Sequence, residues 1–179
     1  MAISTFDGPV RSLGGIFQQG PASVVTITSS TTLNPTAHGG RIIAVGGTLA
    51  SDVVLTLPAI NTSANPASSG PGQDPNTVNN LGVVYTIWVP TTIATSSLKI
   101  GTNGTDKYYG TIFGIDTDSS NALVAYTAGT DNDFINFNGG TTGGVIGTWV
   151  SIFALASAKY MVQGVALGTG SVATPFANS

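Results

Sequence analysis

The sequence predicts an all-β fold, an antiparallel β-sandwich or barrel of jelly-roll-like type that follows an irregular N-terminal arm. The composition is the first reason. Only 7% of the 179 residues are charged and none is glutamate, although glutamate, lysine and arginine are the residues that fill exposed helix faces. Threonine, with 25 copies, and runs of valine and isoleucine take their place, and these β-branched residues suit a pleated sheet.

Short apolar or alternating runs recur from residue 24 onward, which is the second reason. Within 83–89, for example, Val83, Tyr85, Ile87 and Val89 share one face at a period of two, and Pro90 ends the run. Clusters of glycine, asparagine, aspartate and serine separate the runs, as in sandwiches and barrels. The predicted strands are 24–28, 41–45, 52–57, 83–89, 97–100, 108–115, 123–127, 134–138, 148–155 and 159–167.

The chain divides into an extended arm, residues 1–22, and one β domain, residues 23–179, which is long enough for a proper core. In the arm, glycine and proline pairs interrupt the apolar residues, so neither a helix nor a continuous strand is expected. The arm is predicted either to lie across another molecule or to cover an edge of its own domain. Residues 61–80 hold three prolines and little to bury, and are predicted to form a surface excursion, either a solvated loop or a subunit contact.

The charge and cysteine content exclude several kinds of partner and site. Because the chain has no cysteine, it has no disulfide, thiolate metal site or cysteine nucleophile. Its five basic residues are scattered, whereas nucleic-acid binding needs a basic patch. No apolar run approaches the roughly 20 residues that span a bilayer, and the first residues lack the apolar core of a signal peptide. We expect no nucleic acid, no membrane and no cofactor.

Few side chains are candidates for catalysis or metal binding. His38, the only histidine, is expected to hydrogen-bond locally, because no Gly-x-Ser-x-Gly elbow accompanies it. Two aspartate pairs, Asp116 with Asp118 and Asp131 with Asp133, could supply the two carboxylates of a glycoside hydrolase. Both pairs lie in turn-like stretches, where aspartate bonds to nearby amides. We expect turn chemistry there and no enzyme activity, with a calcium ion held by oxygen ligands as the alternative.

The aromatic residues lie in strand-like runs, and most of them are predicted to belong to the core. Tyr108 and Tyr109 are adjacent, so their rings must point to opposite faces, and one ring is expected at an interface or partly exposed. Sugar binding through a stacked aromatic ring remains open. Phe176, in the Gly/Ser/Thr-rich tail, is either a pin for its own domain or a contact for another.

Four short strings carry a resemblance to a known class of proteins: MAISTFDGPV (1–10), TAHGGRII (36–43), LTLP (55–58) and ATPF (173–176). The chain is similar along most of its length to small structural proteins of tailed phages, as found on the heads of cyanophages and related aquatic phages. The resemblance implies a capsid decoration, or cement, protein.

Such proteins sit in many copies on the outer surface of the head, commonly as trimers, and clamp neighbouring capsid subunits. The implied partners are the major capsid protein and further copies of this chain. The implied location is the outer capsid surface of the virion, after synthesis in the host cytoplasm. A phage tail fibre or a receptor-binding, glycan-binding β module is the alternative. The contact residues expected in the arm and tail are Phe6, Val10, Leu13, Ile16, Phe17 and Phe176.

Overall fold

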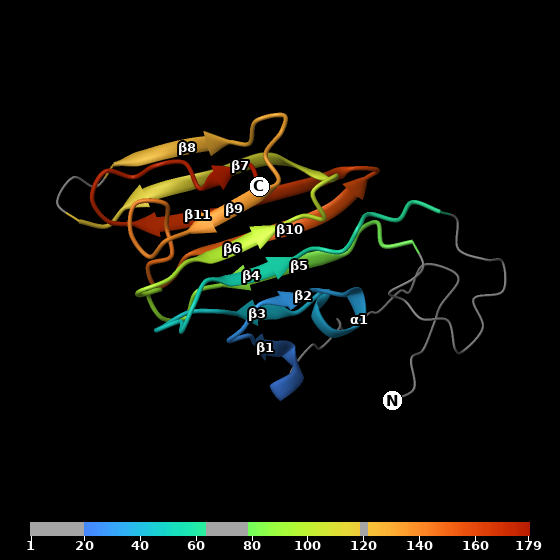
Figure 1. The fold of residues 1–179 in the computed structure, drawn as a ribbon, viewed down its shortest axis with the longest axis horizontal. Helices are drawn as coiled ribbons and strands as arrows, with labels where there is room; N and C mark the ends of the chain where they lie inside the picture. The colour runs from blue at the N-terminus through green and yellow to red at the C-terminus, as the bar shows by residue number, and fades with distance from the viewer. Residues whose placement is uncertain (1–19, 64–78, 119–121) are drawn as a thin grey trace, which may run out of the picture.

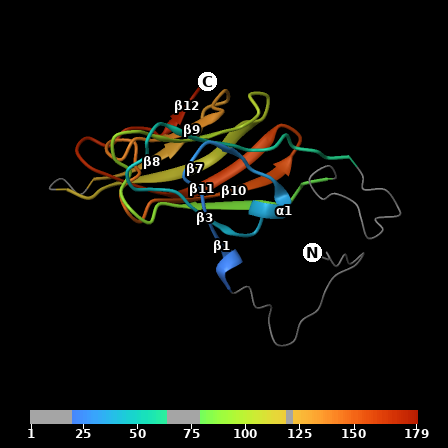
Figure 2. The same cartoon turned by 60° about the horizontal axis from the view of Figure 1, so that its bottom comes forward.

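The computed structural model describes residues 20–63, 79–118 and 122–179, and nearly all of their regular structure is β (Figure 1). Two sheets pack face to face, with one layer above the other in Figure 2. The predicted all-β sandwich is therefore confirmed. The arm residues 1–19, and residues 64–78 of the predicted excursion, lie outside the described residues.

The described residues form a seven-stranded and a five-stranded sheet, with two short helical turns, η1 (Pro21–Ser23) and α1 (Pro35–His38). In spatial order, the seven-stranded sheet consists of β1 (Val24–Thr26), β3 (Ile42–Ala44), β5 (Val84–Trp88), β10 (Trp149–Ala156), β11 (Lys159–Gly168), β7 (Lys107–Asp116) and β8 (Leu123–Thr127). The five-stranded sheet consists of β12 (Phe176–Ala177), β9 (Phe134–Phe137), β6 (Leu98–Gly101), β4 (Val53–Thr56) and β2 (Thr31–Thr32).

All ten predicted strands are present, with ends that differ by at most two residues. Strands β2 and β12 were not predicted, because they have two residues each and are too short to show a period. Helix α1 was not predicted either, although the sequence carries a signal for the start of a helix. The side chain of Asn34 accepts a hydrogen bond from the Ala37 amide at 2.8 Å, and Pro35 occupies the first helical turn.

The expectation of antiparallel, jelly-roll-like strands needs correction, because both sheets are mixed. The first six strands alternate between the two sheets, so that β1, β3 and β5 run parallel in one layer and β2, β4 and β6 run parallel in the other. Later strands add antiparallel pairs, such as β10 with β11, although β7 runs parallel to β11. A chain that crosses between layers after every strand returns to each sheet in the same direction, and this produces parallel neighbours.

The core lies between the two sheets and includes three fully buried tyrosines, Tyr85, Tyr108 and Tyr160. They belong to the seven-stranded sheet and meet residues such as Leu55 and Ile135 of the other sheet. Two of the hydroxyl groups reach across the core or to its rim, since Tyr108 donates to the Ile100 carbonyl at 3.0 Å and Tyr160 to the Pro58 carbonyl at 2.6 Å. Hydrogen bonds between the layers thus accompany the apolar packing.

Candidate functional site

The seven-stranded sheet carries an apolar row across its outer face, away from the other sheet. The register places Trp88 beside Trp149, Trp149 beside Val165, Val165 beside Phe113, and Phe113 beside Ala125. The row therefore crosses five strands, from β5 to β8. Both tryptophans are 39% exposed and Phe113 is 46% exposed, so the described residues leave a large part of each side chain uncovered.

A second apolar row runs across the same face, parallel to the first. A row of polar residues lies between the two apolar rows, two residues from each of them along every strand. It contains Val84, Phe153, Met161 and Tyr109, in the order in which β5, β10, β11 and β7 lie in the sheet. We call these two rows together the outer apolar face. Tyr109 is exposed while Tyr108 is buried, as the sequence analysis expected for adjacent tyrosines.

Hydroxyl and amide groups form the polar row between the two apolar rows. Thr86 and Ser151 share a hydrogen bond at 3.0 Å, and Thr111 and Thr127 share one at 3.4 Å. Gln163 lies between Ser151 and Thr111 in the register. The face thus offers apolar side chains together with uncharged donors and acceptors.

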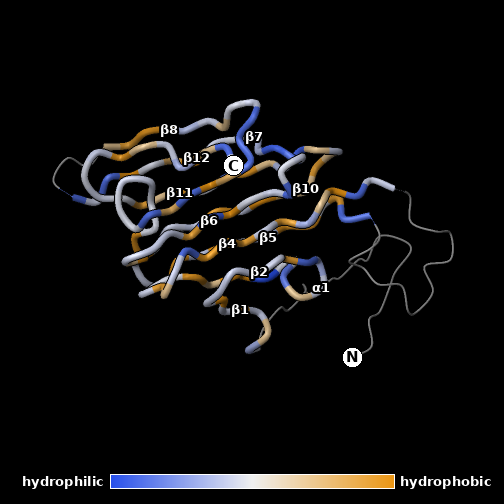
Figure 3. Tube along the Cα trace, in the orientation of Figure 1, coloured by the Kyte–Doolittle hydropathy of each residue, from blue (hydrophilic) through white to orange (hydrophobic). Residues whose placement is uncertain are grey.

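The apolar character continues to the β8 edge of the sheet, as the orange colour of β8 in Figure 3 shows. Leu123 on β8 is 65% exposed, the most of any large hydrophobic residue among the described residues. The charge on this face is small, with Lys159 placed 5.5 Å from the centroid of the Tyr109 ring. Monomeric proteins rarely expose contiguous apolar patches of this kind unless the patch binds something.

The outer face of the five-stranded sheet is different, because small and polar residues dominate it. The register pairs Lys99 with Asn136, Gly101 with Phe134, and Phe134 with Ala177. Gly101 is needed below the aromatic ring, since a Cβ atom there would lie 2.7 Å from Cζ of Phe134. The missing side chain lets the ring lie close to the sheet.

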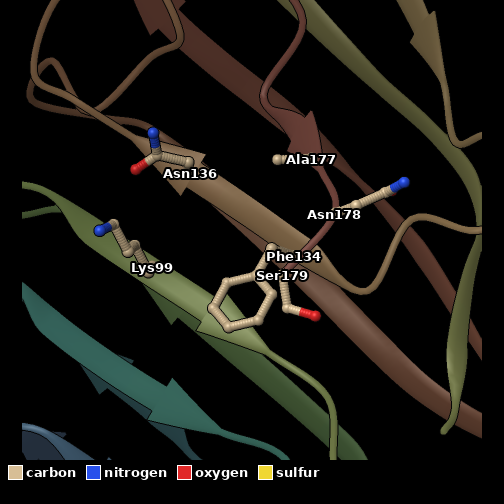
Figure 4. Close-up of a pocket in the computed structure, with 6 residues that line it drawn as sticks. All are labelled: Lys99, Phe134, Asn136, Ala177, Asn178 and Ser179. Atoms are coloured by element: carbon tan, nitrogen blue, oxygen red, sulfur yellow. The ribbon is translucent and has the colours of Figure 1, made fainter. Parts of the chain in front are cut away.

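A groove of about 280 Å³ lies beside this ring. Figure 4 shows Phe134 next to Ser179, with Asn136 on the same strand, β9, and Lys99 on the neighbouring strand β6. Nζ of Lys99 forms an ion pair with Asp52 at 2.6 Å, and Oδ1 of Asn136 is buried without a hydrogen-bond partner. An aromatic ring flanked by amide and hydroxyl groups can stack on a sugar ring and hydrogen-bond to it.

Asp116 and Asp118 lie together at a hollow of about 510 Å³ at the end of β7. One carboxylate oxygen of Asp116 accepts a hydrogen bond from the Asp118 amide at 3.0 Å, and Oδ2 of Asp118 accepts one from the Gly170 amide at 2.6 Å. This is the turn chemistry that the sequence predicted. Oδ2 of Asp116 is buried without a partner, although among the described residues no group of three or more metal-ligating acidic or histidine side chains gathers here or elsewhere.

The second aspartate pair does not face one site. Asp131 is exposed, whereas Asp133 is buried and accepts hydrogen bonds from Nζ of Lys107 at 2.9 Å and from the Ser179 amide at 2.8 Å. Burial raises the pKa of Asp133, but the hydrogen bonds from Lys107 and Ser179 outweigh burial and hold the pKa below its usual value. The chain's own donors therefore occupy this carboxylate.

His38 makes the local hydrogen bond expected from the sequence. It ends α1, is buried, and its Nδ1 atom accepts a hydrogen bond from the Asn34 amide at 3.0 Å. Burial lowers its pKa, so the ring is neutral at neutral pH. The charge of Arg41 also lowers its pKa.

Of the contact residues expected in the arm and tail, the structure places only the last. Phe176 is 7% exposed and its ring lies 6.5 Å from that of Tyr108, centroid to centroid. The structure thus favours the view that Phe176 anchors the C-terminal tail to its own domain, over a contact with another subunit. The five other residues lie outside the described residues: Phe6, Val10, Leu13, Ile16 and Phe17.

The prediction that most aromatic residues belong to the core is wrong. Eleven aromatic residues lie in the predicted strands, and only four of them are fully buried: Tyr85, Tyr108, Phe137 and Tyr160. Both faces of 108–115 and 148–155 carry large apolar residues, so a period of two could not identify the inner face. The apolar content of both faces was the signal that the outer face also carries large apolar side chains.

Comparisons with known proteins add no assignment, since no family model, curated protein or solved structure matches the chain. Among the described residues, no helix has the length and apolar character that crossing a membrane requires.

Proposed function

We propose that the protein is a viral structural protein, a decoration or cement protein that binds the outer surface of a capsid and bridges neighbouring capsid subunits. The observation that carries this proposal is the outer apolar face, which lies opposite a polar face on the same sandwich. A molecule with one adhesive and one polar side fits a layer between a shell and solvent. The resemblance of the four sequence strings to phage head proteins supports the same role.

In this role the protein works by adhesion, and none of its side chains performs catalysis. Each large apolar side chain that becomes fully buried contributes about 1.5–3 kcal/mol before ordering costs are subtracted. Repetition of such contacts over a closed shell strengthens binding through avidity. The net charge of −3 keeps repulsion between neighbouring copies small, which suits dense packing and self-association as a trimer.

The copy number on purified particles tests this proposal. Quantitative mass spectrometry should find the chain at a ratio near one to the major capsid protein, or at a simple fraction of it. Removal of residues 2–20 should lower occupancy on particles that lack the protein, while the melting temperature reports whether the domain still folds. A few copies per particle would assign the protein to the tail instead, and absence from the particle would refute a virion role.

A glycan-binding β module, as in a tail fibre or receptor-binding protein, is the second candidate. The observation that favours it is the groove beside Phe134, with its buried, unpartnered Asn136 oxygen. Binding of host-surface polysaccharide, measured by calorimetry, should be lost in Phe134→Ala and kept in Leu123→Ser, a change on the other sheet. Equal binding by both variants would exclude the groove as a sugar site.

A further inference from the structure

We propose that the outer apolar face of one copy binds the N-terminal segment, residues 1–19, of a second copy of this chain. The inference rests on the proposed self-association and names the surface and the segment that would carry it. It concerns contacts between copies, so it can be tested on the purified protein without a capsid.

The N-terminal segment joins the domain at residue 20. Residue 20 leads through η1 into β1, which is an edge strand of the seven-stranded sheet. In Figure 2, η1 lies below this sheet, on the side away from β9 and β12. The segment therefore joins the domain at one edge of the sheet and on the side of its outer face.

Strongly exposed apolar side chains also lie at the opposite edge of the sheet. Phe113 on β7 and Leu123 on β8 are 46% and 65% exposed, and six strand intervals, about 29 Å, separate β8 from β1. In a ring of identical copies, opposite edges of adjacent copies face each other. The segment of one copy then begins beside β7 and β8 of the next copy, whereas it would have to cross its own entire sheet to reach its own β8.

The chemistry of the segment matches that of the face. Nineteen extended residues span up to about 60 Å, which exceeds the width of the sheet. Its apolar residues, such as Leu13 and Phe17, can pack on the two apolar rows. The backbone amides and carbonyls of an irregular segment need hydrogen-bond partners when they are buried, and the polar row with Ser151, Gln163 and Thr111 supplies uncharged donors and acceptors.

Cysteine cross-linking of the full-length protein tests the contact, because the chain has no cysteine of its own. A mixture of Leu13→Cys and Leu123→Cys proteins should form a disulfide-linked dimer. Linkage should be at least about tenfold faster than with Thr32→Cys, an exposed control on the other sheet, because docking raises the effective concentration. Linkage no faster than the control would overturn the proposal. A double variant, Leu13→Cys with Leu123→Cys, that closes within single chains would also overturn it, in favour of the chain's own sheet.

Tryptophan fluorescence gives an independent reading, since both tryptophans of the chain, Trp88 and Trp149, lie on the outer apolar face. Leu13→Asp should shift their emission to longer wavelength, and so should dilution of the unmodified protein. Ser12→Asp adds the same charge one residue away and should have a smaller effect. Emission that responds to neither change would refute the docking of this segment, and the copy number on particles would still decide the capsid role separately.

Discussion

The hydroxyl of Tyr85 gives the sharpest test of how the core is held together. Tyr85, Tyr108 and Tyr160 are all fully buried, but only the last two hydroxyls have an acceptor, the carbonyls of Ile100 and Pro58. The hydroxyl of Tyr85 is buried without a hydrogen-bond partner. Burial raises the pKa of Tyr85 to about 12, so the group stays neutral over the whole range in which the protein would be studied.

Removal of this hydroxyl in Tyr85→Phe should leave the free energy of unfolding unchanged or raise it. Burying a hydroxyl without a partner costs about 1–3 kcal/mol by mutational measures, and loss of packing around one oxygen atom offsets part of the gain. We expect a net stabilisation of about 0–2 kcal/mol. Tyr160→Phe removes a hydrogen bond and leaves the Pro58 carbonyl without its donor, so it should destabilise the protein by about 1–2 kcal/mol.

Urea unfolding followed by circular dichroism measures both variants against the unmodified protein, and Tyr160→Phe serves as the matched control. For a domain of this size, 1 kcal/mol corresponds to a shift of about 2–4 °C in melting temperature. The free energy of unfolding should therefore fall in Tyr160→Phe, and it should rise or stay unchanged in Tyr85→Phe. Equal destabilisation by both, or a loss above about 1 kcal/mol in Tyr85→Phe, would refute the reasoning from unpaired hydroxyls.

Two further predictions concern buried polar residues that come directly before a strand, Thr148 before β10 and Asp133 before β9. Thr148→Val should cost about 2–4 kcal/mol, because the buried Thr148 hydroxyl accepts hydrogen bonds from the Gly144 and Leu167 amides; Thr148→Ser keeps the hydroxyl and should cost less in the same urea assay. Stability should also fall as the pH drops below about 4, since the pKa of Asp133 is lowered in the folded state and its contribution is lost as the pH falls through that value. A pH series on Asp133→Asn should lack this part of the acid dependence.

The strands were predictable because each has a local signature. A run such as 83–89, with alternating apolar residues and a proline after it, reads as a strand whatever it pairs with. Strand direction has no such signature, since it depends on whether the chain crosses to the other sheet or turns back beside itself. The mixed sheets, with β1, β3 and β5 parallel, therefore could not be derived from the period of the runs.

The surfaces were less predictable than the strands for a related reason. Most aromatic residues were predicted to lie in the core, but Trp88 and Trp149 lie beside each other on the outer face. Their exposure depends on the pairing of β5 with β10, which brings together residues 61 positions apart. The groove at Phe134 depends likewise on Gly101 in a neighbouring strand. Turn chemistry at Asp116 was predictable because its hydrogen bond to the Asp118 amide is local.

The two outer faces together constrain how the protein can exist in solution. The outer apolar face carries two tryptophans and Phe113 with about two fifths or more of each side chain exposed, and with 13 charged residues in the chain little repulsion opposes contact between two such faces. An isolated copy would therefore tend to associate through this face until something covers it. In the proposed ring, a segment of a neighbouring copy covers part of this face, and the rest of the face remains available to bind the capsid surface. Growth through this contact would then stop at a small oligomer, when the ring closes.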